Sequence, residues 1–228
     1  MSNSLIFRQL FESISCTYTY ILGCKASREA VIIDSVLETH ERDAQLLNEL
    51  ELNPVLVLDT HVHADHITGA YKLKSLFPKL QSAISKFSGA KADRLVKDGE
   101  IIMFGQAELE VRLTPGHTNG CATFVSHALR KAFTGDAIFV RGCGRTDFQE
   151  GSARQLYKSV HQKIFLLPQD YALYPAHDYK GHLHTTVAEE QKYNPRFTKS
   201  QEDFISFMKN LKLPPPKLIG KAVAANKL

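Results

Sequence analysis

Apolar residues that alternate with polar ones, or follow each other in short runs, predict two groups of β-strands along the chain. The first group comprises residues 5–11, 17–22, 30–34, 54–58 and 81–85, and the second comprises 101–104, 109–113, 122–126, 131–134 and 171–175. β-Branched and aromatic residues are frequent in these stretches, and Gly, Pro and Asp separate them, as is typical of strands.

Helical spacing of apolar residues predicts helices at 39–52, 67–77, 152–164, 185–192 and 200–211. We expect Thr39 to cap the first helix and Leu73 and Leu76 to face inward from the second. The three consecutive prolines at 214–216 should end helical structure and leave the tail extended.

The order of these elements shows no strict alternation of strand, helix and strand. It favours an α+β fold, an αββα four-layer sandwich in which helices cover two packed sheets. We expect one domain over residues 1–228, with a short helical and extended C-terminal segment from about residue 184.

Composition and charge narrow the class of protein. Hydrophobic residues make up 43% and charged residues 23%, as in a globular protein, and a net charge of +4 suits a small anionic substrate. Clustered Lys and Arg with interleaved aromatic residues are absent, which argues against nucleic acid as a partner. Without a long apolar run or a leader pattern, we expect no membrane contact and a cytoplasmic location. Four cysteines without a C-x-x-C pair indicate free thiols in a reducing compartment.

The segment His61-Val62-His63-Ala64-Asp65-His66 follows directly after the predicted strand at 54–58. Imidazole and carboxylate groups are the ligands that suit zinc or iron. The alternative is a polar loop that happens to be rich in histidine, but three histidines and one aspartate within six residues favour a metal site.

Three more candidate ligands follow other predicted strands: His117, Asp136 and His177. Each alone has an ordinary explanation, as a turn residue, a helix cap or a buried histidine, respectively. Together they repeat one pattern of strand, ligand and turn, which indicates a shared metal site. Ligand counting by itself favours a dinuclear zinc hydrolase.

The segment 61–66, with Gly116-His117, Gly135-Asp136 and Ala176-His177, resembles the metallo-β-lactamase superfamily. That resemblance implies an αββα sandwich with the metal site at the sheet edges. The runs at 60–69, 141–148 (Arg-Gly-Cys-Gly-Arg-Thr-Asp-Phe) and 174–179 more closely resemble the persulfide dioxygenases, the ETHE1-like sulfur dioxygenases. The run at 141–148 lies outside the metal motif that the superfamily shares, so it best distinguishes the resemblance to persulfide dioxygenases from a resemblance to the superfamily in general.

The second resemblance implies an oxidoreductase of sulfide oxidation and sulfur metabolism. It implies one iron(II) per chain, bound by His61, His117 and Asp136, and the oxidation of glutathione persulfide by O₂ and water to sulfite and glutathione. The remaining candidate groups would then orient the ligands or supply a second metal site: His63, Asp65, His66 and His177. Relatives suggest a homodimer, and a separate rhodanese-type sulfurtransferase would be a partner.

Two residues are candidates for binding the substrate. Arg145 could bind the glutathione carboxylates, or alternatively form an ion pair with Asp147. Tyr179 could place a hydroxyl beside the substrate, or alternatively pack in the core. Cys143 in the same loop could accept a persulfide, although a packing role is the simpler interpretation.

Three other functions compete with this interpretation. Glyoxalase II, a hydroxyacylglutathione thioester hydrolase, shares the metal motif, but it carries a substantial helical domain after the last histidine, where this chain has only a short segment. A non-catalytic sulfur carrier would not need a complete ligand set. A nuclease would need a basic groove.

Overall fold

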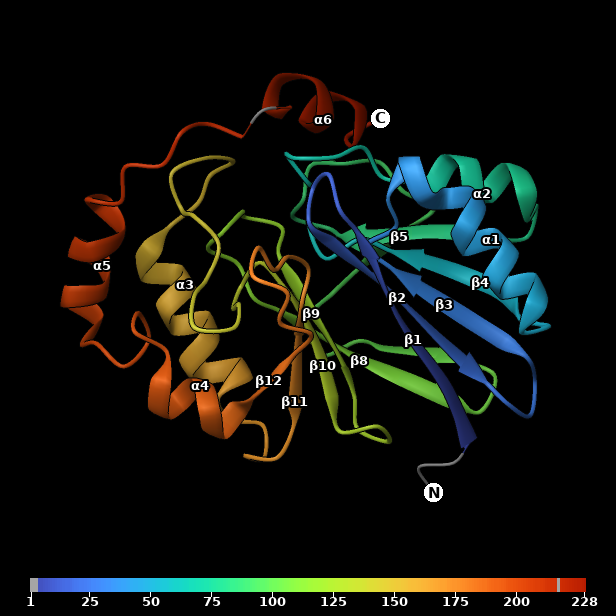
Figure 1. Cartoon of the computed structure of the whole chain (residues 1–228), viewed down its shortest axis with the longest axis horizontal. Helices are drawn as coiled ribbons and strands as arrows, with labels where there is room; N and C mark the ends of the chain where they lie inside the picture. The colour runs from blue at the N-terminus through green and yellow to red at the C-terminus, as the bar shows by residue number, and fades with distance from the viewer. Residues whose placement is uncertain (1–3, 217) are drawn as a thin grey trace.

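Two six-stranded β-sheets face each other in the computed structural model, which describes residues 4–216 and 218–228 (Figure 1). The first sheet has the order β1-β2-β3-β4-β5-β6, and the second has the order β12-β11-β10-β9-β8-β7. The first sheet comprises β1 (Leu5–Glu12), β2 (Thr17–Cys24), β3 (Glu29–Ile33), β4 (Asn53–Leu58), β5 (Gln81–Ser85) and β6 (Arg94–Val96). The second comprises β7 (Ile101–Phe104), β8 (Ala107–Leu113), β9 (Ala122–Ser126), β10 (Lys131–Gly135), β11 (Ala172–Pro175) and β12 (Thr185–Thr186).

Helices cover the outer face of each sheet, which confirms the predicted αββα sandwich (Figure 1). The first sheet carries α1 (His40–Glu49), preceded by the 3₁₀ turn η2 (Leu37–Thr39), and α2 (Ala70–Leu76). The second carries α3 (Ala153–Ser159), which continues into the π-helical turn η3 (Val160–Ile164), as well as α4 (Val187–Tyr193) and α5 (Gln201–Lys209). The last helix, α6 (Ile219–Ala225), lies at one end of the sandwich.

Each of the three interfaces between layers has its own apolar cluster. Tyr20, Phe104 and Phe133 lie fully buried between the two sheets. A second cluster joins the first sheet to α1 and α2, and a third joins the other sheet to α3, α4 and α5. Burying one large apolar side chain contributes about 1.5–3 kcal/mol, so these clusters hold the layers together.

The direction of the strands brings the candidate ligands to one edge. β3, β4, β5 and β6 are parallel, and β10 is parallel to β11. β8 and β10 are both antiparallel to β9, so β8, β10 and β11 end on the same side. The backbone links the sheets there, because the Ala122 N–H donates to the Thr60 carbonyl at 2.8 Å.

Three local predictions are wrong. The tail is not extended, because α6 forms after the proline run, which prevents helix only at its own positions. Leu76, the last residue of α2, faces solvent with 51% of its surface exposed, because Leu73 and Ala70 are the residues of α2 that face the apolar cluster. The Thr39 hydroxyl donates to the Val36 carbonyl and does not cap α1. The short strand β6 has no predicted counterpart.

No helix among the described residues is both long and apolar enough to cross a bilayer.

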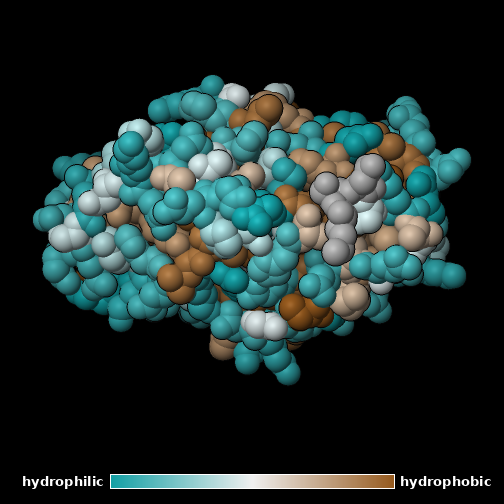
Figure 2. Space-filling view, turned by 90° about the horizontal axis from the view of Figure 1, so that it is seen from below, coloured by the Kyte–Doolittle hydropathy of each residue, from teal (hydrophilic) through white to brown (hydrophobic). Residues whose placement is uncertain are grey.

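The face of the molecule seen in Figure 2 is mostly hydrophilic, and its apolar areas are small and separated. Scattered apolar residues of this kind are normal on a protein surface.

Candidate metal centre

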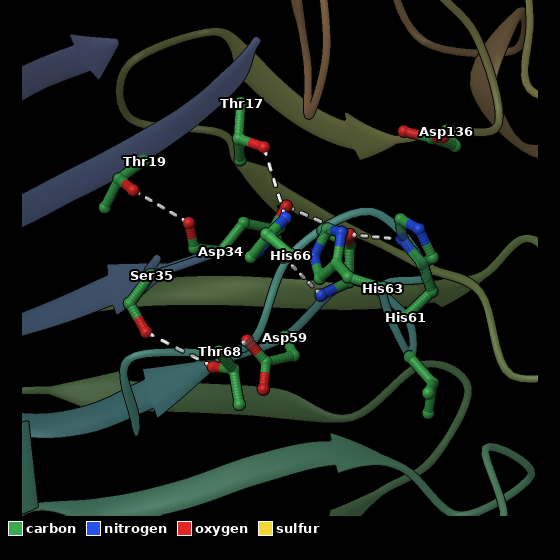
Figure 3. A network of polar contacts seen from close by, with 12 residues as sticks. Thr17, Thr19, Asp34, Ser35, Asp59, His61, His63, His66, Thr68 and Asp136 are labelled. Carbon is green, nitrogen blue, oxygen red and sulfur yellow. Dashed lines mark hydrogen bonds and ion pairs between the residues drawn. The ribbon is translucent and has the colours of Figure 1, made fainter. Parts of the chain in front are cut away.

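The structure brings all seven candidate ligands together at the strand ends, in two neighbouring groups. One group is His61, His117 and Asp136, and the other is His63, Asp65, His66 and His177. Within each group, one donor atom per residue lies within 4.8 Å of the others. Figure 3 shows the imidazoles of His61, His63 and His66 side by side on the loop after β4, with Asp136 approaching from the other sheet.

A chain of hydrogen bonds orients His61. The Thr60 hydroxyl donates to Asp34 Oδ2 at 3.0 Å, so it can only accept from the Nδ1–H of His61, which lies 3.0 Å away. Asp34 Oδ1 also accepts from the Thr60 backbone N–H at 2.7 Å. The Nε2 lone pair of His61 is therefore available to a metal.

His117 is fixed in the same tautomer by a backbone carbonyl. Its Nδ1 lies 2.6 Å from the carbonyl oxygen of Arg145, which can only accept. The neighbouring residue 144 must be glycine, because a Cβ there would lie 2.7 Å from the same Nδ1. His117 Nε2 therefore carries the lone pair, and it lies 3.4 Å from Asp136 Oδ2.

His177 joins the two groups by contacting a carboxylate in each. Its Nδ1 lies 2.7 Å from Asp136 Oδ1, and its Nε2 lies 2.9 Å from Asp65 Oδ2. Burial alone would lower the pKa of His177, but the two carboxylates outweigh it and raise the pKa well above the ordinary value. Burial alone would raise the pKa of Asp136, but His177 and His117 hold it well below the usual range.

His63 lies between the two groups, with its ring centroid 4.1 Å from that of His61 and 4.3 Å from that of His66. Its Nε2 lies 3.1 Å from Asp34 Oδ1. Burial, with help from His66, keeps the pKa of His63 well below its usual value, so the imidazole is neutral.

The donor atoms in these groups fit a divalent metal. Burial and the neighbouring His63 also hold the pKa of His61 well below its usual value, so its imidazole is a neutral ligand. His63 Nδ1 and His66 Nε2 are buried without a hydrogen-bond partner, although buried polar atoms rarely lack one. Two imidazoles and a carboxylate in the first group match the ligand set of non-haem iron sites, while the second group could hold another cation.

A cleft of about 480 Å³ opens onto the first group and carries both predicted substrate-binding residues, Arg145 and Tyr179. Tyr179 is 68% exposed, and its ring stacks on that of His177 with the centroids 6.2 Å apart. It does not pack in the core. Phe139, Leu213 and Pro214 give the cleft apolar walls.

Arg145 forms the ion pair that was the alternative to substrate binding. Its Nε and Nη2 contact the two carboxylate oxygens of Asp147 at 2.7 and 2.8 Å. Its Nη1 and Nη2 also donate to the carbonyls of Pro214 and Leu213. The guanidinium thus holds the C-terminal segment at the cleft, which leaves few donors for a ligand.

Arg196 is a cation of the cleft that no sequence pattern predicts as a site residue. Its Nη1 donates to the Cys143 carbonyl at 2.8 Å and lies 3.4 Å from the Cys143 sulfur. Among residues 4–216 and 218–228, no carboxylate lies within ion-pair distance of its guanidinium. Cys143 itself is buried, which raises the pKa of its thiol to about 11.

Comparison with known proteins identifies the family. The family model of the metallo-beta-lactamase superfamily matches residues 16–177. Persulfide dioxygenase ETHE1 of Homo sapiens mitochondria is 57% identical over 222 residues, 97% of this chain and 87% of that protein. Hydroxyacylglutathione hydrolase GloC of Haemophilus influenzae is 33% identical and covers 74% of this chain and 87% of its own length. The crystal structure of ETHE1 from Myxococcus xanthus has a TM-score of 0.94 at 49% identity and covers 97% of this chain and 98% of that one. The chain therefore belongs to the metallo-β-lactamase superfamily and, within it, to the persulfide dioxygenases.

Proposed function

We propose that this enzyme is an iron(II)-dependent persulfide dioxygenase that oxidises glutathione persulfide. O₂ and water convert the outer sulfur of the persulfide to sulfite, and glutathione and two protons are released. The sulfane sulfur supplies all four electrons that reduce O₂, so no external reductant is needed. The observation that carries the proposal is the group His61, His117 and Asp136 at the base of a cleft, in a chain 57% identical to a persulfide dioxygenase.

The residues around this group would hold one iron and prepare its ligands. His61 and His117 present Nε2, because the Nδ1 of each is engaged with Thr60 and Arg145, respectively. His177 donates to Asp136 Oδ1 and keeps that carboxylate oriented. His63 is bonded to Asp34 and lies outside the group, which supports three protein ligands. Bound iron(II) would supply the open positions at which a sulfur ligand and O₂ meet.

The cleft supplies the groups that a glutathione moiety needs. Arg196 has donors that no carboxylate of the described residues uses, so it suits a glutathione carboxylate better than Arg145 does. Tyr179 presents an exposed ring beside His177. Phe139 and Leu213 give the cleft an apolar wall that would shield the reacting sulfur from part of the solvent. A homodimer and a separate rhodanese-type sulfurtransferase belong to the same proposal, as does the cytoplasmic location.

Oxygen uptake tests the proposal directly. Anaerobically purified, iron-loaded protein should consume O₂ when glutathione persulfide is added and should form sulfite in equal amount. His117→Ala and Asp136→Ala should abolish both signals, whereas His127→Ala, on the surface beside Glu110, should not. Protein that retains iron and shows no uptake would refute the dioxygenase.

A thioester hydrolase is the second candidate, favoured by the unpaired nitrogens of His63 and His66 in the second group. Two metals bound across both groups would support hydrolysis of a hydroxyacylglutathione. Zinc-loaded protein assayed with S-lactoylglutathione distinguishes the two candidates. Rapid hydrolysis that is lost in His66→Ala would favour the hydrolase.

A further inference from the structure

The loop between β4 and α2 carries His61, His63, Asp65 and His66, and it forms neither helix nor strand. Its backbone polar groups cannot pair with each other in a regular ladder, so their partners must come from elsewhere in the chain. One partner is Gln149, whose side-chain amide donates to the Val62 carbonyl at 2.8 Å.

Asn226 is another partner, and it makes three bonds to the loop. Its Nδ2 donates to the His63 carbonyl at 3.0 Å and to the His66 carbonyl at 2.9 Å. Its Oδ1 accepts the Thr68 backbone N–H at 2.9 Å. The two carbonyls accept and the N–H donates, so only one orientation of the amide satisfies all three bonds.

Asn226 lies at the end of α6, at the far end of the chain from the loop it contacts. α6 is itself anchored, because Ala222 is fully buried and the Lys91 N–H donates to the Lys227 carbonyl at 3.2 Å. Asn226 therefore bonds the loop to a fixed element at the end of the sandwich (Figure 1).

We propose that Asn226 is a positioning residue for the metal centre. It contacts none of the donor atoms and acts through the backbone of His63, His66 and Thr68. By fixing this loop it keeps Asp65 Oδ2 at 2.9 Å from His177, which in turn holds Asp136. The inference rests on the metal site of the proposed function, and it assigns a role in that site to the C-terminal helix.

Two substitutions separate this role from a general structural one. Asn226→Ala removes all three bonds. Asn226→Asp keeps the acceptor for the Thr68 N–H but sets a carboxylate oxygen against the carbonyls of His63 and His66. Asn210→Ala is the matched control, because Asn210 also ends a helix, α5, but within the described part of the chain its side chain bonds only to the Ser206 carbonyl of that helix.

The measurement is iron(II) affinity by anaerobic competition with a chromogenic chelator, together with the melting temperature of the metal-free protein. We expect both Asn226 variants to bind iron about 10–100-fold more weakly, as is typical when a group that orients metal ligands is lost. The metal-free melting temperature should fall by no more than about 5 °C. Asn210→Ala should leave the iron affinity within about two-fold of the unmodified protein.

Two outcomes would overturn the inference. One is an iron affinity of Asn226→Asp and Asn226→Ala within about two-fold of the unmodified protein. The other is an equal loss of affinity in Asn210→Ala. Failure of the unmodified protein to bind iron is a different result, since it would contradict the proposed function itself.

Discussion

Thr60→Val tests whether the hydrogen-bond chain behind His61 prepares the metal ligand. Valine has nearly the shape of threonine, so the main change is the loss of one hydroxyl. That hydroxyl links His61 Nδ1 to Asp34 Oδ2, with both distances at 3.0 Å. The other two contacts of Asp34, from the Thr60 N–H and His63 Nε2, remain.

The expected magnitude follows from the two groups that lose a partner. Each buried polar group left without a hydrogen bond costs about 1–3 kcal/mol, so the free energy of unfolding of the metal-free protein should fall by about 2–6 kcal/mol. His61 should also lose its fixed tautomer, which should weaken iron binding by about 10–100-fold.

Urea unfolding of the metal-free protein and chelator competition for iron measure the two effects. Thr123→Val is the control, because it removes a buried hydroxyl that bonds, among the residues that the structure describes, to Thr114 at 3.0 Å and to none of the candidate ligands. It should cost about 1–3 kcal/mol and leave iron affinity unchanged. If Thr60→Val binds iron as tightly as the unmodified protein, the reasoning about His61 is wrong.

Three further predictions concern other parts of the molecule. Arg196→Ala should raise KM for glutathione persulfide about 10–100-fold in steady-state oxygen uptake, because a charge-assisted hydrogen bond contributes about 1.5–3 kcal/mol. The control, surface Arg154→Ala, should leave KM unchanged. An unchanged KM in Arg196→Ala would contradict the contact between Arg196 and the substrate. Burial raises the pKa values of the Cys121 and Cys143 thiols to about 12 and 11, so neither should react with iodoacetamide in native protein at pH 8, and mass spectrometry that finds either modified would contradict this. Hydrogen bonds from Lys74 and from the backbone of β5 lower the pKa of Asp93 to about 2. The ionised Asp93 therefore stabilises the fold above about pH 4, and this contribution is lost as the pH falls towards 2. In an acid titration, the free energy of unfolding of Asp93→Asn should fall less over that window than that of the unmodified protein, by less than about 1 kcal/mol because the carboxylate is over one-third exposed.

The sequence predicts the sheets and the gathering of ligands because both depend on local patterns. Buried strands such as β2 and β4 are rich in β-branched, aromatic and aliphatic residues, and the candidate ligands lie in the turns and loops that follow strands. When the two sheets pack with these strand ends at the same edge, the ligands that follow the strands come close together. The structure places His61, His117 and Asp136 in one group there. Which of them bind metal remains a prediction.

What the sequence does not predict depends on contacts between distant segments. In the sequence, Arg196 is indistinguishable from any arginine that follows a helix. Only the fold brings it into the cleft beside Cys143. Asn226 lies in a tail expected to be extended, so nothing nearby indicates that it bonds to the loop of His63 and His66. The pairing of Arg145 with Asp147 was one of two open alternatives, and geometry was needed to find it.

The ligands His61, His117 and Asp136 come from both sheets, which has a consequence for folding kinetics. The donor atoms converge only after the sheets have packed, so the site is absent from the unfolded chain and incomplete in any state where one sheet has formed alone. A metal bound only after the transition state slows unfolding without accelerating folding. Iron added to refolding protein should therefore leave the folding rate unchanged and lengthen the lifetime of the native state.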